Sequence, residues 1–414
     1  MLWFTGTREC YDRRVPAAHA RIYLDHNATT PVDPLVVAAV AEAMRNDFGN
    51  ASSVHHFGQQ AKSRLDEARH EVAALIGGAA SEVVFTSGGT EADNFALRGA
   101  AEALEPLGKR HLVVSAIEHE AVLTTARALE RRGWRVTRVP ATASGVVDPD
   151  AVAAALTDDT ALLSLMHANN EVGTLQPVAA CAAAAHARGV LVHTDAVQSA
   201  GKVPVDVSAL DVDLLSLSGH KLYGPKGVGA LWIRRGTRLL SPMTGGKQER
   251  SRRAGTENVP GIVGFGVAAR LARERLDADA LAQASLRDRL ETGILSRVPG
   301  THVNGGASPR VPNTTNIGFD GIEAESLLIA LDLDGIAVST GSACSSGTLE
   351  PSHVLKAMGL PLHDTQNALR LSLGRHTTAD DVGRVLDVVP GLVERLRTLT
   401  DRRTPASATH GGTR

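Results

Sequence analysis

Residues 212–221 read VDLLSLSGHK, an apolar run that ends in glycine, histidine and lysine. Four earlier runs have the same form, apolar at first and polar at the end: EVVFTSGG (82–89), HLVVSAIEHE (111–120), TALLSLMHANN (160–170) and GVLVHTDAVQ (189–198). Near-continuous apolar strands are typical of a parallel sheet that is covered on both faces. Helical patterns such as EAVLTTARALERRG (120–133) separate the runs. The sequence therefore predicts an α/β fold with a mostly parallel sheet.

The pattern changes near residue 270. A long helical stretch, AARLARERLDADALAQASLRDRLETGILSRV (268–298), is followed by VPNTTNIGFDG (311–321) and further helices. We predict a large domain over residues 36–272 and a smaller α+β domain over residues 273–400. Residues 1–20 are expected to be a poorly ordered extension, and residues 401–414 a disordered tail.

Composition restricts the class of protein. The chain has 414 residues, of which 43% are hydrophobic and 21% charged, with a formal net charge of −2. These values suit a large soluble protein and give no electrostatic support for binding nucleic acid or a membrane surface. No apolar run is long enough to span a bilayer, and the N-terminus lacks the apolar segment of a signal peptide. Three widely spaced cysteines argue against a disulfide framework, so we expect a cytoplasmic protein.

Lys221 stands out among the lysines because it directly follows a buried strand and has Ser218 and His220 as neighbours. A lysine at a strand end is often only a solvent-exposed surface residue. However, apolar surroundings lower the pKa of an amine and make it nucleophilic, as formation of a Schiff base requires. A lysine of this kind implies a carbonyl cofactor such as pyridoxal phosphate.

Other strand ends carry groups that such a cofactor needs. A carboxylate must face the pyridine nitrogen, and Asp195 suits that role, although it equally suits a helix N-cap. The Gly-Gly turn before Thr90 opens a helix whose first amides could bind the phosphate, although Thr90 also reads as a simple cap. His119 could lie flat on the ring or be structural. Chemistry in parallel α/β folds gathers at the carboxyl ends of the strands, where all these residues fall.

The cysteines differ in their settings. Cys344 lies in STGSACSSGTLEP (339–351), where small polar residues and glycines surround it, as around a reactive and accessible thiol. Cys181 lies in an alanine-rich helix and is expected to be packed, while Cys10 belongs to the N-terminal extension. On its setting alone, Cys344 could be reactive or incidental.

Nine motifs together resemble one known family. They are IYLDHNATTPVDP, TSGGTEADN, EHEAVL, MHANNEVGTLQP, HTDAVQSAGK, SGHKLYGPKGVGAL, RRAGTENVPGIVG, GSACSSGTLEPSHVL and RLSLGRHTT, in this order from residue 22 to 378. The sequence is similar to the class V aminotransferase family of fold-type I pyridoxal-phosphate enzymes, and within it to cysteine desulfurases of the NifS/IscS group. The resemblance implies a sheet of the seven-stranded type, and that residues 21–35 lie near the active site and pack with the small domain.

The resemblance also implies a role for each matching residue. Lys221 would hold the cofactor as a Schiff base, Asp195 would pair with the ring nitrogen, and His119 would stack on the ring and act in catalysis. Arg370 would bind the substrate carboxylate, with Asn170 beside it. The remaining cofactor contacts would come from Gly89, Thr90, Asn170, Gln198, Ser218 and His220, and from Thr256 of the second subunit of a homodimer.

The implied activity is that of a cysteine desulfurase. L-cysteine would be converted to L-alanine, and Cys344 would carry the sulfur as a persulfide to an acceptor, either an iron–sulfur scaffold protein or a tRNA-thiolating enzyme. No resident metal is expected, with Cys344 meeting an iron–sulfur cluster only during transfer. The alternative is a selenocysteine lyase or another enzyme of the class V family. A cysteine in the position of Cys344 favours the desulfurase, because an aminotransferase has no use for it.

Overall fold

The computed structural model describes residues 21–340 and 351–403. The N-terminal extension with Cys10, the segment 341–350 with Cys344, and the tail from residue 404 onward lie outside the described residues.

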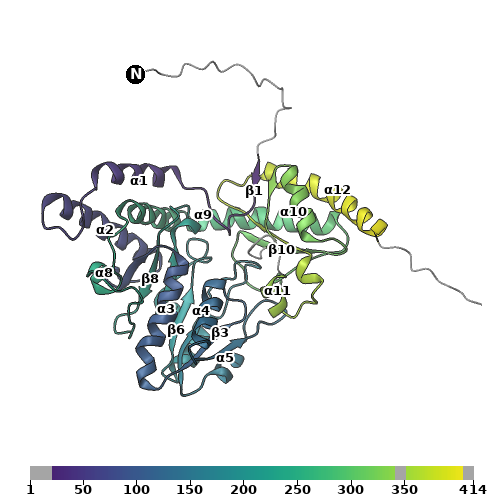
Figure 1. Ribbon diagram of the computed structural model, residues 1–414. Coiled ribbons are helices and arrows are strands. Elements are labelled where there is room, and N and C mark those ends of the chain that lie inside the picture. The colour runs from purple at the N-terminus through teal and green to yellow at the C-terminus, as the bar shows by residue number, and fades with distance from the viewer. Residues whose placement is uncertain (1–20, 341–350, 404–414) are drawn as a thin grey trace, which may run out of the picture.

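A seven-stranded sheet forms the centre of the larger part of the molecule (Figure 1). Its strand order is β2-β8-β7-β6-β5-β3-β4, and every neighbouring pair is parallel except those that involve β8. This confirms the predicted α/β fold with a mostly parallel sheet. The strands are β2 (Val83–Thr86), β3 (His111–Ser115), β4 (Arg135–Val139), β5 (Thr160–Ser164), β6 (Leu191–Asp195), β7 (Leu214–Ser218) and β8 (Gly229–Ile233).

Both faces of this sheet are covered, which explains the apolar runs in the sequence. Side chains that alternate along a strand point to opposite faces. Val84 and Leu214 pack with residues of α3 (Gly89–Leu104) and α4 (Glu120–Glu130). Their neighbours Val83 and Leu215 belong to a second core, together with residues of α2 (His56–Leu75), α6 (Val178–His186) and α9 (Val259–Arg297). Because each strand needs apolar residues on both sides, it shows no polar alternation.

A smaller antiparallel sheet lies at the other end of the molecule. Its order is β12-β10-β9, with strands β9 (Thr301–Val303), β10 (Thr314–Phe319) and β12 (Ala368–Ser372). Nearby, β1 (Ile22–Tyr23) pairs in parallel with β11 (Ile336–Ala337). A separate hydrophobic core joins these strands to the end of α9, to α10 (Ala324–Leu333) and to α12 (Ala379–Arg403).

Two helix bounds differ from the sequence-based expectation. Helix α9 begins at Val259, nine residues before the predicted start, and it runs without a break across the proposed domain boundary at 272/273 (Figure 1). The division into two domains therefore stays a prediction. Helix α12 extends to Arg403, so residues 401–403 are helical and not part of a disordered tail.

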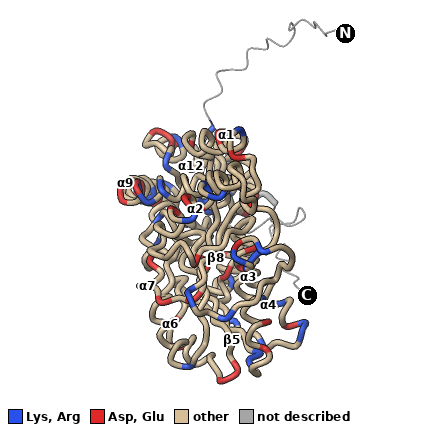
Figure 2. The backbone as a smooth tube through the Cα atoms, turned by 90° about the vertical axis from the view of Figure 1, so that its left-hand side faces the viewer, with Lys and Arg blue, Asp and Glu red and all other residues tan. Residues whose placement is uncertain are grey.

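The remaining helices are short or peripheral: α1 (Pro34–Asn46), α5 (Pro149–Ala155), α7 (Val207–Leu210), α8 (Gln248–Ser251) and α11 (His353–Ala357). Charged residues of both signs are interspersed over the chain (Figure 2). None of the helices in the described ranges has a stretch long and apolar enough to cross a membrane. Cys181, a residue of α6, is buried in the core, as its alanine-rich context predicts.

Candidate active site

A cavity of about 280 Å³ opens at the carboxyl ends of strands β2, β3, β5, β6 and β7. This edge is where parallel α/β sheets present their loops, and it collects residues that are far apart in the sequence. Nine of the residues predicted from the sequence line this cavity: Gly89, Thr90, His119, Asn170, Asp195, Gln198, Ser218, His220 and Lys221.

Lys221 follows β7 in a tight turn, Gly219–Lys221. Its Nζ donates hydrogen bonds to the backbone carbonyls of Asn27 and Ala28, the latter at 2.8 Å. Burial lowers the pKa of Lys221 to about 8, and the positive charge of Arg370 acts in the same direction. Near neutral pH about a tenth of this amine is therefore uncharged and able to act as a nucleophile or a base, far more than for an ordinary lysine.

Asp195 ends strand β6 and is buried. Its Oδ1 accepts a hydrogen bond of 2.8 Å from the backbone N–H of Val197. Burial raises the pKa of Asp195, while the positive charges of His119 and Lys221 oppose that rise. The next helix, α7, begins only at Val207 and has its own cap, Asp206, so Asp195 does not serve as a helix cap.

His119 has two functions in the fold. Its ring Nδ1 accepts a hydrogen bond from the backbone N–H of Ala121 at 3.1 Å and thereby caps helix α4. With Nδ1 occupied as an acceptor, the neutral ring carries its proton on Nε2. The ring also lines the cavity, where burial lowers its pKa and the charge of Asp195 counteracts this. Both readings of His119, structural and active-site, are thus compatible with the structure.

The N-terminus of helix α3 forms one end of the cavity. The first amides of a helix have no partner within the helix and attract anions. Thr90 lies at this end, and Ser218 and His220 line the cavity with it. A Cβ at Gly89 would lie 2.8 Å from Cγ2 of Val197, so a glycine permits the close approach of the Val197 side chain to this backbone. Burial lowers the pKa of His220 to about 4, which leaves its ring neutral.

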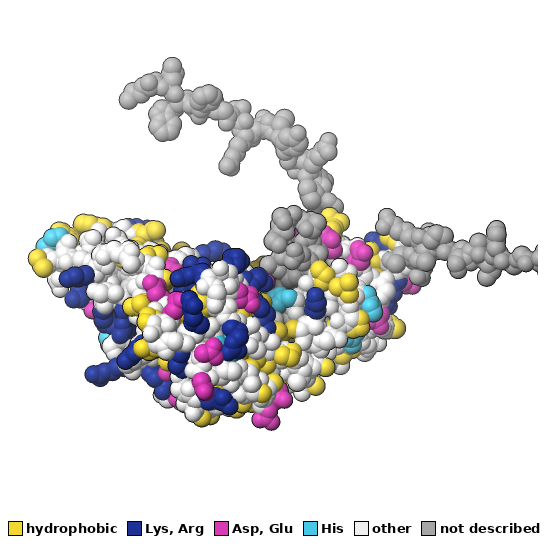
Figure 3. Space-filling view, turned by 60° about the horizontal axis from the view of Figure 1, so that its bottom comes forward, with side chains coloured by type: hydrophobic (Ala, Val, Ile, Leu, Met, Phe, Trp, Pro, Cys, Tyr) yellow, Lys and Arg dark blue, Asp and Glu magenta, His cyan; other side chains and the backbone are white. Residues whose placement is uncertain are grey.

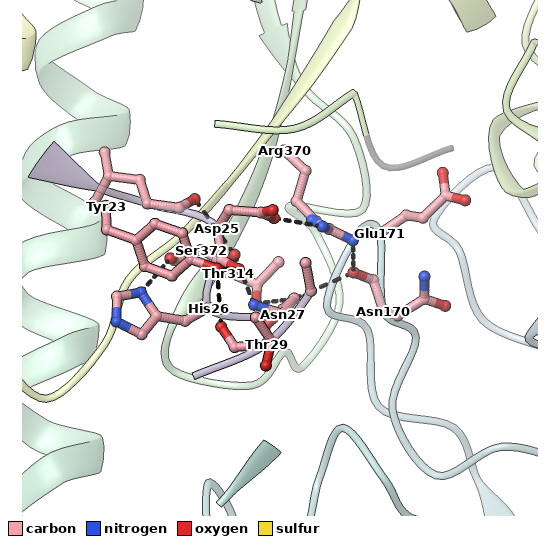
Figure 4. Close-up of polar contacts among 12 residues, drawn as sticks. Tyr23, Asp25, His26, Asn27, Thr29, Asn170, Glu171, Thr314, Arg370 and Ser372 are labelled. Atoms are coloured by element: carbon pink, nitrogen blue, oxygen red, sulfur yellow. Dashed lines mark hydrogen bonds and ion pairs between the residues drawn. The ribbon is translucent and has the colours of Figure 1, made fainter. Parts of the chain in front are cut away.

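The segment from Tyr23 to Thr29 covers the site from the other side (Figure 4). The side chain of Asn27 donates to the backbone carbonyl of Asn170 at 3.2 Å and to Thr314 Oγ1 at 2.8 Å. Its backbone carbonyl accepts from Lys221 and from Gln198, the latter at 2.9 Å. Asn27 therefore connects the large sheet with strand β10 of the small one.

Arg370 in β12 does not line the cavity, but it contacts Asn170, which does (Figure 4). Its Nη2 forms an ion pair of 2.7 Å with Asp25, and its Nη1 donates to the carbonyl oxygen of Asn170 at 3.1 Å. Its Nε is buried and has no hydrogen-bond partner among the described residues.

Two further predicted residues do not line the cavity. Thr256 is exposed to solvent. Cys344 falls outside the described residues, but the flanking residues are anchored beside the cavity. On one side, Ser339 pairs through its backbone with Arg370. On the other, Ser352 Oγ donates to Glu171 at 2.5 Å, and His353 Nε2 is 2.9 Å from the carbonyl oxygen of Glu118.

Sequence reasoning missed three residues of this region. Asp93 lines the cavity, and its pKa is raised well above the usual value by burial and by the charge of Asp195. Its position one helical turn after Gly89 could have indicated that it shares the helix end. Asn27 and Lys202 lie in the quoted motifs LDHNATT and QSAGK, but nothing in those motifs shows what they contact.

The lining of the cavity suits pyridoxal phosphate. An anion site, a nucleophilic amine and a buried carboxylate surround one space large enough for a small ring compound. In addition, the Oδ1 atom of Asn170 is buried without a hydrogen-bond partner in the part of the chain that the structure describes. Such an atom indicates that a polar group completes the site.

Comparison with known proteins gives a consistent result. The family model described as Aminotransferase class-V matches residues 22–385. A cysteine desulfurase of Gluconacetobacter diazotrophicus is 49% identical over 393 residues, which cover 94% of this chain and 98% of that protein. The cysteine desulfurase IscS of Methanosarcina thermophila is 48% identical over 391 residues, with coverage of 94% and 96%. A solved structure named NifS-like protein matches with a TM-score of 0.84 at 38% identity and covers 91% of this chain and 100% of its own. With the strand order, the cavity and these matches in agreement, the chain belongs to the aminotransferase class-V family.

Proposed function

We propose that this protein is a pyridoxal-phosphate-dependent cysteine desulfurase. One observation carries the proposal: a lysine amine with a lowered pKa and a buried aspartate share one cavity, in a chain that matches proteins named cysteine desulfurase over nearly its whole length. The same relatives give no support to the alternative, a selenocysteine lyase.

The described residues would have different roles in the cavity. Thr90, Ser218, His220 and the first amides of α3 would hold the phosphate, and Asp195 would face the ring nitrogen. When bound, pyridoxal phosphate withdraws electrons from the Cα of the substrate. Lys221 Nζ would take the Cα proton, since an amine with a pKa of about 8 is a competent base at neutral pH. Arg370 would attract the substrate carboxylate through its charge and its unpartnered Nε.

Cys344 would remove the sulfur. Its thiolate attacks the sulfur of L-cysteine, the carbon–sulfur bond breaks, the electron pair and a proton go to the carbon, and alanine leaves while a persulfide remains on Cys344. The anchors of the segment support this role, because Ser339 pairs with Arg370, which contacts Asn170 of the cavity. Cys344 is five residues further along, a reach of up to about 17 Å in extended chain. An iron–sulfur scaffold protein or a tRNA-thiolating enzyme would then accept the sulfur.

A homodimer would complete the site. Large hydrophobic side chains are exposed on α1 and the stretch after it, among them Met44, Phe48 and Val54, at the end of the molecule that appears at the left in Figure 3. Exposed apolar groups of this kind mark interfaces. The exposed Thr256 would contact the phosphate bound by the partner subunit.

The test is to incubate the holoenzyme with L-cysteine and to measure alanine by chromatography and the mass of the protein. Wild type and Cys181→Ser should release alanine and gain one sulfur atom on Cys344. Cys344→Ser should release almost no alanine, because a serine hydroxyl does not ionise near neutral pH. Alanine release by Cys344→Ser at the wild-type rate would refute the desulfurase.

A further inference from the structure

Lys202 lies behind the wall of the cavity, in the turn after β6. Its Nζ donates a hydrogen bond of 2.8 Å to Gln198 Oε1 and one of 3.0 Å to Asn27 Oδ1. It does not line the cofactor cavity but faces a separate space of about 20 Å³, which it shares with Tyr223 and Arg375. Apart from the effect of its charge on Lys221, Lys202 therefore acts on the cavity through the two side chains that it holds.

The contact determines which way the Gln198 amide points. The Lys202 amine donates to Gln198, so the amide oxygen of Gln198 faces it. The amide nitrogen is then on the other side, where it donates one hydrogen to the carbonyl oxygen of Asn27 at 2.9 Å. Gln198 also lines the cavity, and its second amide hydrogen is left for a group bound there.

We propose that Lys202 is a positioning residue that makes Gln198 present an N–H donor, and not its carbonyl, to the phenolic oxygen of the cofactor. This inference rests on the proposed binding of pyridoxal phosphate and adds a residue to it. An ionised phenolic oxygen accepts hydrogen bonds, so a rotated amide would place two oxygens against each other. Lys202 disfavours that rotation together with the Asn27 carbonyl: its N–H groups would then face the amide nitrogen, and the carbonyl oxygen would face the amide oxygen.

The surroundings of Lys202 agree with this role. Burial lowers the pKa of Lys202 well below its ordinary value, and the charges of Lys221 and Arg370 act in the same direction. The two hydrogen bonds that the structure gives this amine both run from its N–H groups to amide oxygens. Asn27 is held in turn by Asn313, whose Nδ2 donates to the same Asn27 Oδ1 at 3.1 Å.

The test follows the visible absorbance band of the holoenzyme as a function of pH. A donor at the phenolic oxygen withdraws electron density and weakens the basicity of the nitrogen that joins Lys221 to the cofactor. Removal of the donor should therefore raise the pH midpoint of the band, by about one pH unit for a hydrogen bond to a charged atom. Lys202→Met, which keeps the length of the side chain, should show this rise, and the exposed Lys62→Met should not. Lys202→Gln, which can still donate, should shift the midpoint less.

A double-mutant cycle separates positioning from a general effect of charge or stability. Gln198→Ala should raise the midpoint by itself, and Lys202→Met should add nothing in the Gln198→Ala background. Other charged or titratable groups also face the cofactor site, namely Asp195, His119 and Arg370. They are identical in all variants, so their effects on the midpoint cancel in the comparison. If Lys202→Met does not fold, Lys202→Gln replaces it in the same cycle.

Two results would overturn the proposal: an unchanged midpoint in both Lys202 variants, or an equal rise with and without Gln198. Failure of the proposed function at the cofactor would be recognised differently, since wild type itself would then show no visible band that titrates.

Discussion

Lys221 owes its reactivity to its position at the end of a buried strand. Two backbone carbonyls hold its Nζ, while burial and Arg370 disfavour its charge. Asp195 and Asp93 lie across the same cavity as two carboxyl groups in a buried setting, and the pKa of each is raised by burial. The cavity thus contains a nucleophile and two buried carboxyl groups with raised pKa values, as functional sites often do.

The pKa of Lys221 predicts how the apoprotein takes up its cofactor. Only the neutral amine attacks the aldehyde of pyridoxal phosphate, and a folded-state pKa of about 8 makes it available two pH units lower than for an ordinary lysine. The rate of appearance of the visible band should therefore rise with pH and level off above about 8. Stopped-flow absorbance measures this rate. A range from about pH 6 to about pH 10 includes the pKa of Lys221 and approaches that of an ordinary lysine. A rate that still rises steeply above pH 9 would show that the amine is not perturbed.

Residues of this site could be predicted from the sequence where they directly follow an apolar run that reads as a strand. Lys221 and Asp195 each follow an apolar run, and the fold brings the strand ends to one edge. The contacts of Asn27 with Lys202 and Asn170, and of Arg370 with Asn170, could not be predicted in this way, since each joins segments more than 140 residues apart. Local patterns contain no information on such pairs.

At the scale of elements, a buried ion pair fastens the segment before Thr256 to the core. Arg69 of α2 donates to both carboxylate oxygens of Glu249, at 2.6 and 2.8 Å, and Glu249 also accepts from the backbone N–H of Phe85. Glu249 and the next two residues, Arg250 and Ser251, all have positive φ, a conformation that non-glycine residues rarely adopt. The ion pair holds this backbone in place.

Glu249→Ala should therefore destabilise the protein by about 3–5 kcal/mol, because it leaves the charge of Arg69 buried and unpaired. Urea unfolding measures the loss. Asp387→Ala, which removes the exposed ion pair of Arg297 and Asp387, is the matched control and should change little. Similar stabilities of the two variants would mean that the buried pair is dispensable.

Some helices and strands could be predicted from the sequence more accurately than others, because local patterns favour some of them and oppose others. Strands β5, β6 and β7 are short apolar runs bounded by polar residues, and they fall within the quoted segments. The start of α9 was missed, because VPGIVGFG contains a proline and three glycines, which disfavour a helix in isolation. Burial of Ile262 and Phe265 overrides this preference.

At the scale of the whole molecule, two copies are predicted to share each site. A Lys221→Ala subunit and a Thr256→Ala subunit should form heterodimers in which one site contains both native residues. After subunit exchange, the mixture should recover up to about a quarter of wild-type activity, since half of the dimers are mixed and half of their sites are intact. Alanine release before and after exchange is the measurement. If exchange is verified by mass and activity does not rise above that of the separate variants, Thr256 does not act across subunits.

The central claim is that Lys221 binds the cofactor in this cavity and takes part in the release of alanine from L-cysteine. The most direct measurement compares Lys221→Ala with Lys226→Ala, a nearby exposed lysine outside the cavity, for both the visible cofactor band and alanine production. We predict that Lys221→Ala folds but loses the band and the alanine, and that Lys226→Ala retains both. Loss of the band in Lys226→Ala, with its retention in Lys221→Ala, would contradict the account.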